Sequence, residues 1–563
     1  MVGELLLLLA THLVLTALPG VAAAMFLASR GERRVPVLLA VALAASGVGG
    51  MLGFWIYYGS HLLGQSFTYV LAIGSALATG WLLYGGGIER SLLRRLSIPL
   101  GLWVLGSAFL VFFGFMHGGA DTALGTASNR FGGTTLPSDI DIPLYFAEFF
   151  YTHSHHGVPP EFPGEWLASD RPPLQVGYVL SQQPFAFNSP ELSYEILGVC
   201  LQQLWIVGLW ALLVAAGVGR LTKALAMVAV LASPLVFVNG FFVWPKLLPA
   251  AMLLAAAALL VTPLWAEMRS RLWAGALVGA LLGLAMMGHG SSAFPILALV
   301  LIPAFRGLPS RRWVAVGLGV LIVVMAPWSV YQKWGDPPGN RLIKWQIGGV
   351  INVDSRGSLE TIEDSYEEAG IGGTIHNKAE NLVTVTGGGM FASDVKQIWE
   401  ATGRGEITTA VRELRGAFFL YLLPSLGLLL LGPLAMLAAI RRKRPGDPAD
   451  WHFARDCLLV FAVGGAGWCL LMFGNGAART VIHQGSYFLP IIGVCACIAG
   501  LRAVLPRLGT WIVGISTVLM LALYAPALGP GEGNSYSFGT ILLAAIFLLG
   551  FCWLLWRSDI EDP

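Results

Sequence analysis

Six carboxylates lie in one polar stretch of the sequence, between two apolar regions. Asp139 and Asp141 come directly before an amphipathic segment, Leu144 to Tyr151, that could lie flat at a membrane interface. The other four follow along the same stretch: Glu148, Glu161, Glu165 and Asp170. A carboxylate placed at a water boundary could act as a general base and take a proton from an acceptor hydroxyl.

A helix cap is the alternative explanation of the first acidic pair. Ser138 or Asp139 could cap the helix that follows, with Asp141 in its first turn. Capping needs one acidic residue, whereas this stretch supplies six. We therefore favour a chemical role for Asp139 or Asp141 and keep the cap as the alternative.

A fixed cation follows the carboxylates. Arg171 stands next to Asp170 and opens the run Arg171-Pro172-Pro173-Leu174. A guanidinium keeps its charge and can hold two oxygens of a phosphate at once. The sequence therefore predicts Arg171, with Asp170 beside it, in the binding of a phosphate or another part of a substrate.

This pattern resembles the GT-C glycosyltransferases, polytopic enzymes that take sugars from polyprenyl-phosphate carriers on the outer face of the membrane. They include protein mannosyltransferases, aminoarabinose transferases of lipid A and mycobacterial arabinosyltransferases. The shared features are an acidic motif after an early span, an interfacial aromatic segment and a Pro-Pro-Leu run on the same loop. The resemblance is clearest over residues 97–350, and beyond them only hydropathy and topology match.

The resemblance implies that Asp139 or Asp141 is the catalytic base. The His-Pro-Pro-Leu run common in relatives begins here with Arg171, so a fixed cation replaces a titratable group and no proton role is expected there. Three spans precede the span that leads into the acidic loop, whereas many relatives place the motif after their first span. Residues 1–96 are therefore an N-terminal addition or a variant arrangement.

The implied activity is transfer of a sugar from a polyprenyl-phosphate donor to an envelope acceptor, which could be a glycan, a lipid or a protein. Nucleotide sugars are cytoplasmic, so a transferase on the outer face needs a donor that crosses with the membrane. We expect a bacterial inner (plasma) membrane protein with an extracytoplasmic active site. No cofactor is assigned, although two carboxylates could hold a divalent metal such as Mg²⁺ or Mn²⁺.

Two other functions compete with this one. An O-antigen polymerase or ligase also has many spans and a large outer loop, but relies more on Arg and His than on an early acidic pair. A transporter or flippase usually carries charged residues inside its spans, and here they are almost absent. The acidic pair with Pro-Pro-Leu favours the transferase.

Further candidates for binding the donor phosphate or the substrate lie at the outer ends of predicted spans or in outer loops: Lys246, His289, Lys333, Arg341, Arg479 and His483. Three of them have a plainer explanation. Lys246 could extend to the interface beside Trp244. His289 could satisfy a helix break, and Arg479 could be an exposed loop charge. His153, His155 and His156 favour a solvated loop over a metal site, because no second ligand set accompanies them.

The composition indicates that these residues are positioned by the helices of a membrane protein. Of 563 residues, 56% are hydrophobic and 12% are charged, and the mean hydropathy is +0.71. The charged fraction is about half of that in soluble domains. The net charge of +2 argues against a nucleic-acid partner. The six cysteines lie in or beside apolar stretches, which favours packing over disulfides or metal binding.

A membrane span needs roughly 20 apolar residues, and the sequence contains about fifteen such runs (13–15). They lie near 4–27, 36–58, 67–87, 97–116, 195–218, 223–240, 247–265, 271–288, 292–306, 312–331, 415–440, 455–474, 481–501, 508–527 and 537–556. Every second connection is rich in Arg or Lys, which predicts an external N-terminus and a cytoplasmic C-terminus.

The predicted fold is an all-α, GT-C-like polytopic membrane protein with two long extracytoplasmic loops. Residues 1–96 form N-terminal spans, and 97–350 form the catalytic module, which includes the first long loop at 117–193. The second long loop, 332–414, contains an acidic helical stretch that we interpret as a lid or acceptor-facing segment. Residues 415–563 form C-terminal spans.

Overall fold

The computed structural model describes residues 2–85, 87–117, 122–129, 131, 138–187, 189–352, 355–420, 422–441, 447–474, 487–525 and 538–558. Within these residues the regular structure is helical and contains no strand, apart from an isolated bridge between Phe162 and Trp166. The prediction of an all-α protein is therefore confirmed. A bilayer core offers no water to backbone amides, so a chain this apolar satisfies them within helices.

The first half of the chain forms α1 (Val2–Ser29), α2 (Val35–Gly59), α3 (His61–Gly85), α4 (Arg90–Phe115), α5 (Ala123–Ser128), α6 (Ile142–His153), α7 (Leu174–Gln182), α8 (Pro190–Gln202), α9 (Trp205–Ala216), α10 (Arg220–Leu231), α11 (Pro234–Phe241), α12 (Leu247–Leu260) and α13 (Trp265–Met268). The second half forms α14 (Leu272–Gly288), α15 (Ala293–Phe305), α16 (Arg311–Val330), α17 (Arg341–Gly348), α18 (Ser358–Val385), α19 (Gly388–Gly403), α20 (Ile407–Leu420), α21 (Leu422–Leu426), α22 (Leu431–Arg441), α23 (Pro448–Leu471), α24 (Phe488–Val504), α25 (Pro506–Leu523) and α26 (Phe538–Ser558). Short 3-10 or π turns occupy Ser138–Ile140, Ala168–Asp170, Gln183–Phe185, Gly290–Ser292, Tyr331–Gly335 and Gly427–Leu430.

Ten helical segments of the described chain are long and apolar enough to cross a membrane. The helices α10 and α11 form a pair bent by 49°, and the number of such segments rises to eleven if this pair is taken as one span. Four shorter apolar helices are also present. The chain is therefore a multi-pass membrane protein. Each of the fifteen predicted spans overlaps one of these helices or helix pairs. The crossing of all fifteen stays a prediction.

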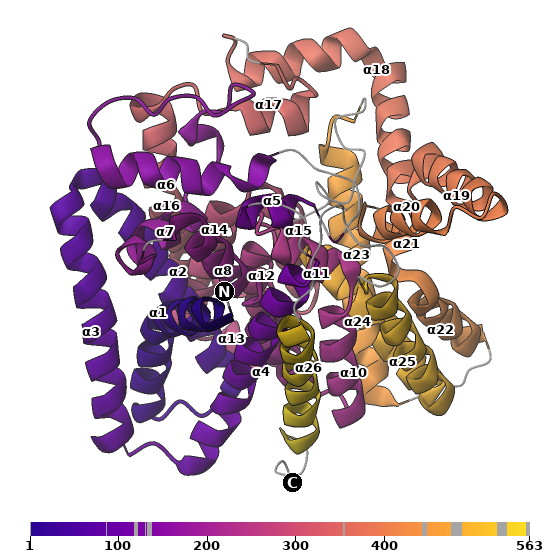
Figure 1. Cartoon of the computed structure of the whole chain (residues 1–563), viewed down its shortest axis with the longest axis horizontal. Coiled ribbons are helices and arrows are strands. Elements are labelled where there is room, and N and C mark those ends of the chain that lie inside the picture. The colour runs from indigo at the N-terminus through magenta and orange to yellow at the C-terminus, as the bar shows by residue number, and fades with distance from the viewer. Residues whose placement is uncertain are drawn as a thin grey trace.

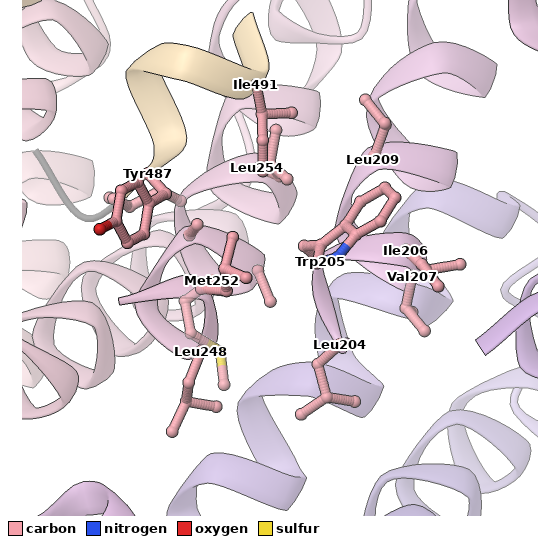
Figure 2. Packing of buried hydrophobic residues seen from close by; sticks show 14 of the residues in the cluster. Leu204, Trp205, Ile206, Val207, Leu209, Leu248, Met252, Leu254, Tyr487 and Ile491 are labelled. Carbon is pink, nitrogen blue, oxygen red and sulfur yellow. The ribbon is translucent and has the colours of Figure 1, made fainter. Parts of the chain in front are cut away.

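The centre of the molecule is built on α12, whose residues from Leu247 to Leu260 are all buried. It packs against α9, and Figure 2 shows side chains of both helices there, with Ile491 of α24 beside them. Gly208 permits this close approach, because a Cβ at that position would lie 2.5 Å from the carbonyl oxygen of Ala251. Small residues let membrane helices pack backbone against backbone.

The connections between helices gather into two ends. At one end Arg33 pairs with Glu89 at 3.4 Å, and Arg306 pairs with Asp456 at 2.5 Å. At the other end the two long loops lie together, and Figure 1 shows α6, α17 and α18 at the top of the view, with the C-terminus at the bottom.

The second long loop is largely helical. Its acidic stretch, predicted as a helix near residues 359–368, forms the first part of α18. Lys378 of the same helix donates hydrogen bonds to the hydroxyl of Tyr366 at 2.7 Å and to the carbonyl of Met472 at 2.5 Å. These contacts tie the loop to the end of α23.

A buried arginine joins three segments near the loop end. The guanidinium of Arg415, on α20, donates to the carbonyl oxygens of Phe131 at 2.8 Å, Leu523 at 2.9 Å and Ala525 at 3.0 Å. The Tyr524 hydroxyl donates in return to the Arg415 carbonyl at 2.5 Å. The side chain of Arg415 is buried, and its hydrogen bond to Phe131 is buried as well, whereas those to Leu523 and Ala525 are partly buried.

We predict that Arg415→Met destabilises the protein by about 3 kcal/mol, because one buried and two partly buried hydrogen bonds from a charged donor are lost. The melting temperature in detergent should fall by several degrees. Arg412→Met on the same helix is the matched control, since its pair with Glu413 is solvent-exposed and contributes less than about 1 kcal/mol. Equal melting temperatures for the two variants would contradict the role given to Arg415.

Candidate functional site

The two long loops are clasped together by hydrogen bonds. The amide of Ser169 donates to a carboxylate oxygen of Asp336 at 2.9 Å, and the Ser169 hydroxyl donates to the Asp336 carbonyl at 2.5 Å. Asp170 accepts from the amides of Leu167 and Arg341, both at 3.1 Å. Burial raises the pKa of Asp170, while these amides oppose the shift. Asp170 therefore organises the loops.

Arg341 completes this clasp. Its guanidinium donates to the carbonyl oxygens of Gly164 at 2.7 Å, Glu165 at 2.8 Å and Ile351 at 2.8 Å. It also packs on the ring of Trp166, 4.1 Å from the ring centroid. The Arg341 side chain is therefore used to hold the two loops together, and it is not assigned to phosphate binding.

Arg171 lies on the same indole ring but points toward a carboxylate. Its guanidinium carbon is 4.1 Å from the Trp166 centroid, and its Nη2 lies 3.4 Å from an oxygen of Asp139. The side chain is only 11% exposed. Its Nε is buried and has no hydrogen-bond partner among the described residues. A buried guanidinium with an unused donor is costly unless an anion satisfies it.

Lys246 shares the electrostatic environment of Arg171. It lies between α11 and α12 and is buried, with its ammonium 4.6 Å from the ring centroid of Trp244. Burial lowers the pKa of Lys246, the positive charge of Arg171 lowers it further, and Asp139 opposes both. The side chain is thus enclosed by protein, and the extension to the membrane interface considered from the sequence is not observed.

Buried glutamines hold the elements that carry these charges. Gln202 of α8 accepts from the Leu247 amide at 2.9 Å, which fixes the start of α12 directly after Lys246. Gln202 also donates to Gln175 at 3.0 Å, and Gln175 donates to the Val243 carbonyl at 2.9 Å. This chain of hydrogen bonds joins the segment after Arg171 to the segment before Lys246.

The acidic pair is held against α8 by Tyr194. The Tyr194 hydroxyl donates to the carbonyl of Ile140, between the two aspartates, at 2.7 Å. Asp141 is the residue before α6, yet its side chain makes no capping hydrogen bond. The residues considered as caps from the sequence, Ser138 and Asp139, lie instead in the 3-10 turn Ser138–Ile140, and Asp141 lies at the cap position rather than in the first turn.

Asp141 belongs to a group of carboxylates. Burial raises its pKa, and the charges of Glu191 and Asp139 raise it further. Glu191 accepts from the amide of Leu124 at 2.8 Å. Glu195, one turn along α8, is fully buried and interacts electrostatically with Asp141, and neither of its oxygens has a hydrogen-bond partner in the described part of the chain.

Glu195 was missed by the sequence analysis, which expected almost no charge inside the spans. The signal was its spacing of four from Glu191, which places both side chains on one helical face. Glu195 is also the first residue of the predicted span 195–218, and a carboxylate at that position is expected at the membrane boundary rather than inside the span.

The remaining candidates are not brought to this group. The ring of His289 accepts from the Ser291 amide at 3.0 Å, which satisfies the helix break before α15 as the plainer explanation held. Lys333 is exposed and packs on Trp334, 5.0 Å from the ring centroid. Arg479 and His483 lie outside the described residues.

No metal site accompanies the carboxylates in the part of the chain that the structure describes. No group of three or more His, Cys, Asp or Glu residues there has a metal-binding arrangement. The rings of His155 and His156 are tilted by 38° with centroids 4.1 Å apart, and His155 contacts the Gly59 carbonyl at 3.1 Å.

The chain matches no protein-family model, no curated protein and no solved structure. The resemblance to GT-C glycosyltransferases thus rests on the short motifs of the first long loop. The geometry of Asp139, Asp141, Arg171 and Lys246 is independent of that resemblance.

We predict that Asp141→Asn stabilises the protein at pH 7 but not below pH 3.8. The folded state raises the pKa of Asp141 above its ordinary value of 3.8, so folding favours the protonated form. Its contribution to stability therefore falls as pH rises from 3.8 through the folded pKa, and Asn removes that loss. Melting temperatures of the two proteins across this range measure the effect.

Glu363→Gln, an exposed carboxylate on α18, is the control and should give pH-independent differences near zero. A difference in melting temperature between Asp141→Asn and wild type that is the same at every pH would show that the folded state does not raise the pKa of Asp141.

Proposed function

We propose that the protein is a membrane glycosyltransferase that moves a sugar from a polyprenyl-phosphate donor to an envelope acceptor. The observation that supports it best is the buried Arg171, whose guanidinium faces Asp139, shares its environment with Lys246 and keeps a donor unused. Two buried cations beside a group of carboxylates suit a substrate with an anionic leaving group and a hydroxyl nucleophile.

The cations would serve the phosphate. In the transfer, the bond between the sugar's anomeric carbon and the phosphate oxygen breaks, and the negative charge on the departing phosphate grows. Arg171 and Lys246 would stabilise that charge, Lys246 from a buried position and Arg171 with a side chain that is 11% exposed, and such interactions strengthen as water is excluded. The glutamine chain described above would keep the two cations in register.

The carboxylates would serve the acceptor. Its hydroxyl oxygen forms the new glycosidic bond, and its proton passes to a base. Asp141 suits this role better than Asp139, because its pKa is raised and its side chain is not used as a cap. A base whose pKa lies closer to neutrality transfers protons more effectively. Asp139, which pairs with Arg171, would instead orient the guanidinium.

The proposal includes the setting that the sequence predicts. The site lies at the end formed by the long loops, which is the extracytoplasmic end of an inner-membrane protein if the basic connections face the cytoplasm. A lipid-linked donor could then reach the site from the outer leaflet, and the acceptor would be a glycan, lipid or protein of the envelope.

Turnover of lipid-linked sugars tests the proposal. Purified protein is supplied with a panel of polyprenyl-phosphate sugars and an envelope extract as the source of acceptor, and donor consumption is measured. We expect one donor to be consumed, and Asp141→Asn to lower kcat by roughly 10²–10⁴-fold, the range for loss of a general base. Asp139→Asn should act mainly by raising KM for the donor, since it disturbs Arg171.

Glu161→Gln, an exposed carboxylate of the same loop, is the control and should keep wild-type turnover. Consumption that survives both aspartate substitutions would refute the assignment of the site. Absence of consumption across the full donor panel, in the presence of the extract, would refute the transferase.

A further inference from the structure

The end of the molecule opposite the long loops contains a separate cavity of about 390 Å³. It lies where the start of α2 meets α4 and α9. Arginines form part of its wall, namely Arg33, Arg34 and Arg95. The rest is apolar and includes Ile98, Trp210 and Val214. A cavity with a cationic rim and an apolar floor fits an amphiphile with a negative head.

Of the three arginines in the cavity wall, Arg95 is the one whose charge has no protein partner among the described residues. It is exposed at the cavity, and the structure gives it no hydrogen bond or ion pair to any described residue. Arg33 is engaged by the protein at two atoms, since its Nε pairs with Glu89 at 3.4 Å and its Nη1 donates to the Ala28 carbonyl at 3.0 Å, but its side chain is still 41% exposed. Arg34 forms ion pairs with Glu32 and Glu267, and so it contributes to the cavity wall rather than to binding of the phosphate.

Two further features favour an anion here. Lys223 of α10 adds a positive charge, with its ammonium 4.9 Å from the ring centroid of the cavity residue Trp210. The cavity also borders Val35 and Pro36, the first residues of α2, whose N-terminus carries the positive end of a 25-residue helix dipole. Anionic headgroups are attracted by such basic clusters at the ends of membrane helices.

We propose that this cavity binds an anionic phospholipid of the leaflet at the basic end of the protein. The phosphate lies between Arg95 and Arg33, and an acyl chain lies along Ile98, Trp210 and Val214. The apolar floor decides between a lipid and a free phosphate, since inorganic phosphate gains nothing from apolar contact. The inference is independent of the proposed transferase, because the two sites lie at opposite ends.

Lipid binding to the whole purified protein tests this proposal. The protein in neutral detergent is titrated with phosphatidylglycerol, and bound lipid is counted by native mass spectrometry. We expect Arg95→Gln to raise the dissociation constant of the tightest site roughly fivefold, the effect of removing one cation near a headgroup. Ala215→Phe, which fills the apolar wall, should also weaken binding.

Arg311→Gln, an exposed arginine at the same end but outside the cavity wall, is the matched control and should leave the constant unchanged. An equal effect of Arg311→Gln and Arg95→Gln would overturn the site in favour of general surface charge. Competition by inorganic phosphate at the concentration of the lipid, or equal affinity for phosphatidylcholine, would overturn the anionic lipid as its occupant.

Discussion

A bilayer gives a buried polar group no partner, and every charge in this protein is placed under that constraint. The spans hide their backbone in helices, and the long loops carry most of the polar chemistry to one end. Arg415 is tolerated in the interior because three carbonyls accept from it. Arg171 and Glu195 are different, because each keeps a buried polar atom without a partner in the described chain.

A buried polar group without a partner is expensive for a fold and useful for a reaction. The clasp of Ser169 and Asp170 with the second loop fixes the backbone directly before Arg171. Tyr194 holds the acidic pair, and Gln202 holds the start of α12 after Lys246. Rigid, fully bonded neighbours thus position the few groups that are not fully bonded, which is how a site keeps reactive charge in a stable protein.

Much of this arrangement could be predicted from the sequence, because it depends on local pattern. Apolar runs located the helices, and the carboxylates and Arg171 singled out the first long loop. The contact between Arg171 and Asp139 was not predicted. Contacts between distant segments could not be read in this way. Nothing local indicates that Arg341 binds the carbonyls of Gly164 and Glu165, that Arg415 reaches Phe131, or that Lys246 is enclosed rather than extended. Those outcomes depend on tertiary packing.

The proposed role of Arg171 is to bind the phosphate of a lipid-linked substrate, and the affinity of the protein for the sugar-free polyprenyl phosphate tests that role. Wild type, Arg171→Gln and Arg171→Lys are compared with Lys333→Gln, an exposed cation at the same end, after melting temperatures confirm that each is folded. We expect roughly tenfold weaker binding for Arg171→Gln, because a charge-assisted contact to the phosphate is lost. Binding should recover in part with Arg171→Lys and stay unchanged with Lys333→Gln. Unchanged affinity in folded Arg171→Gln would contradict this role.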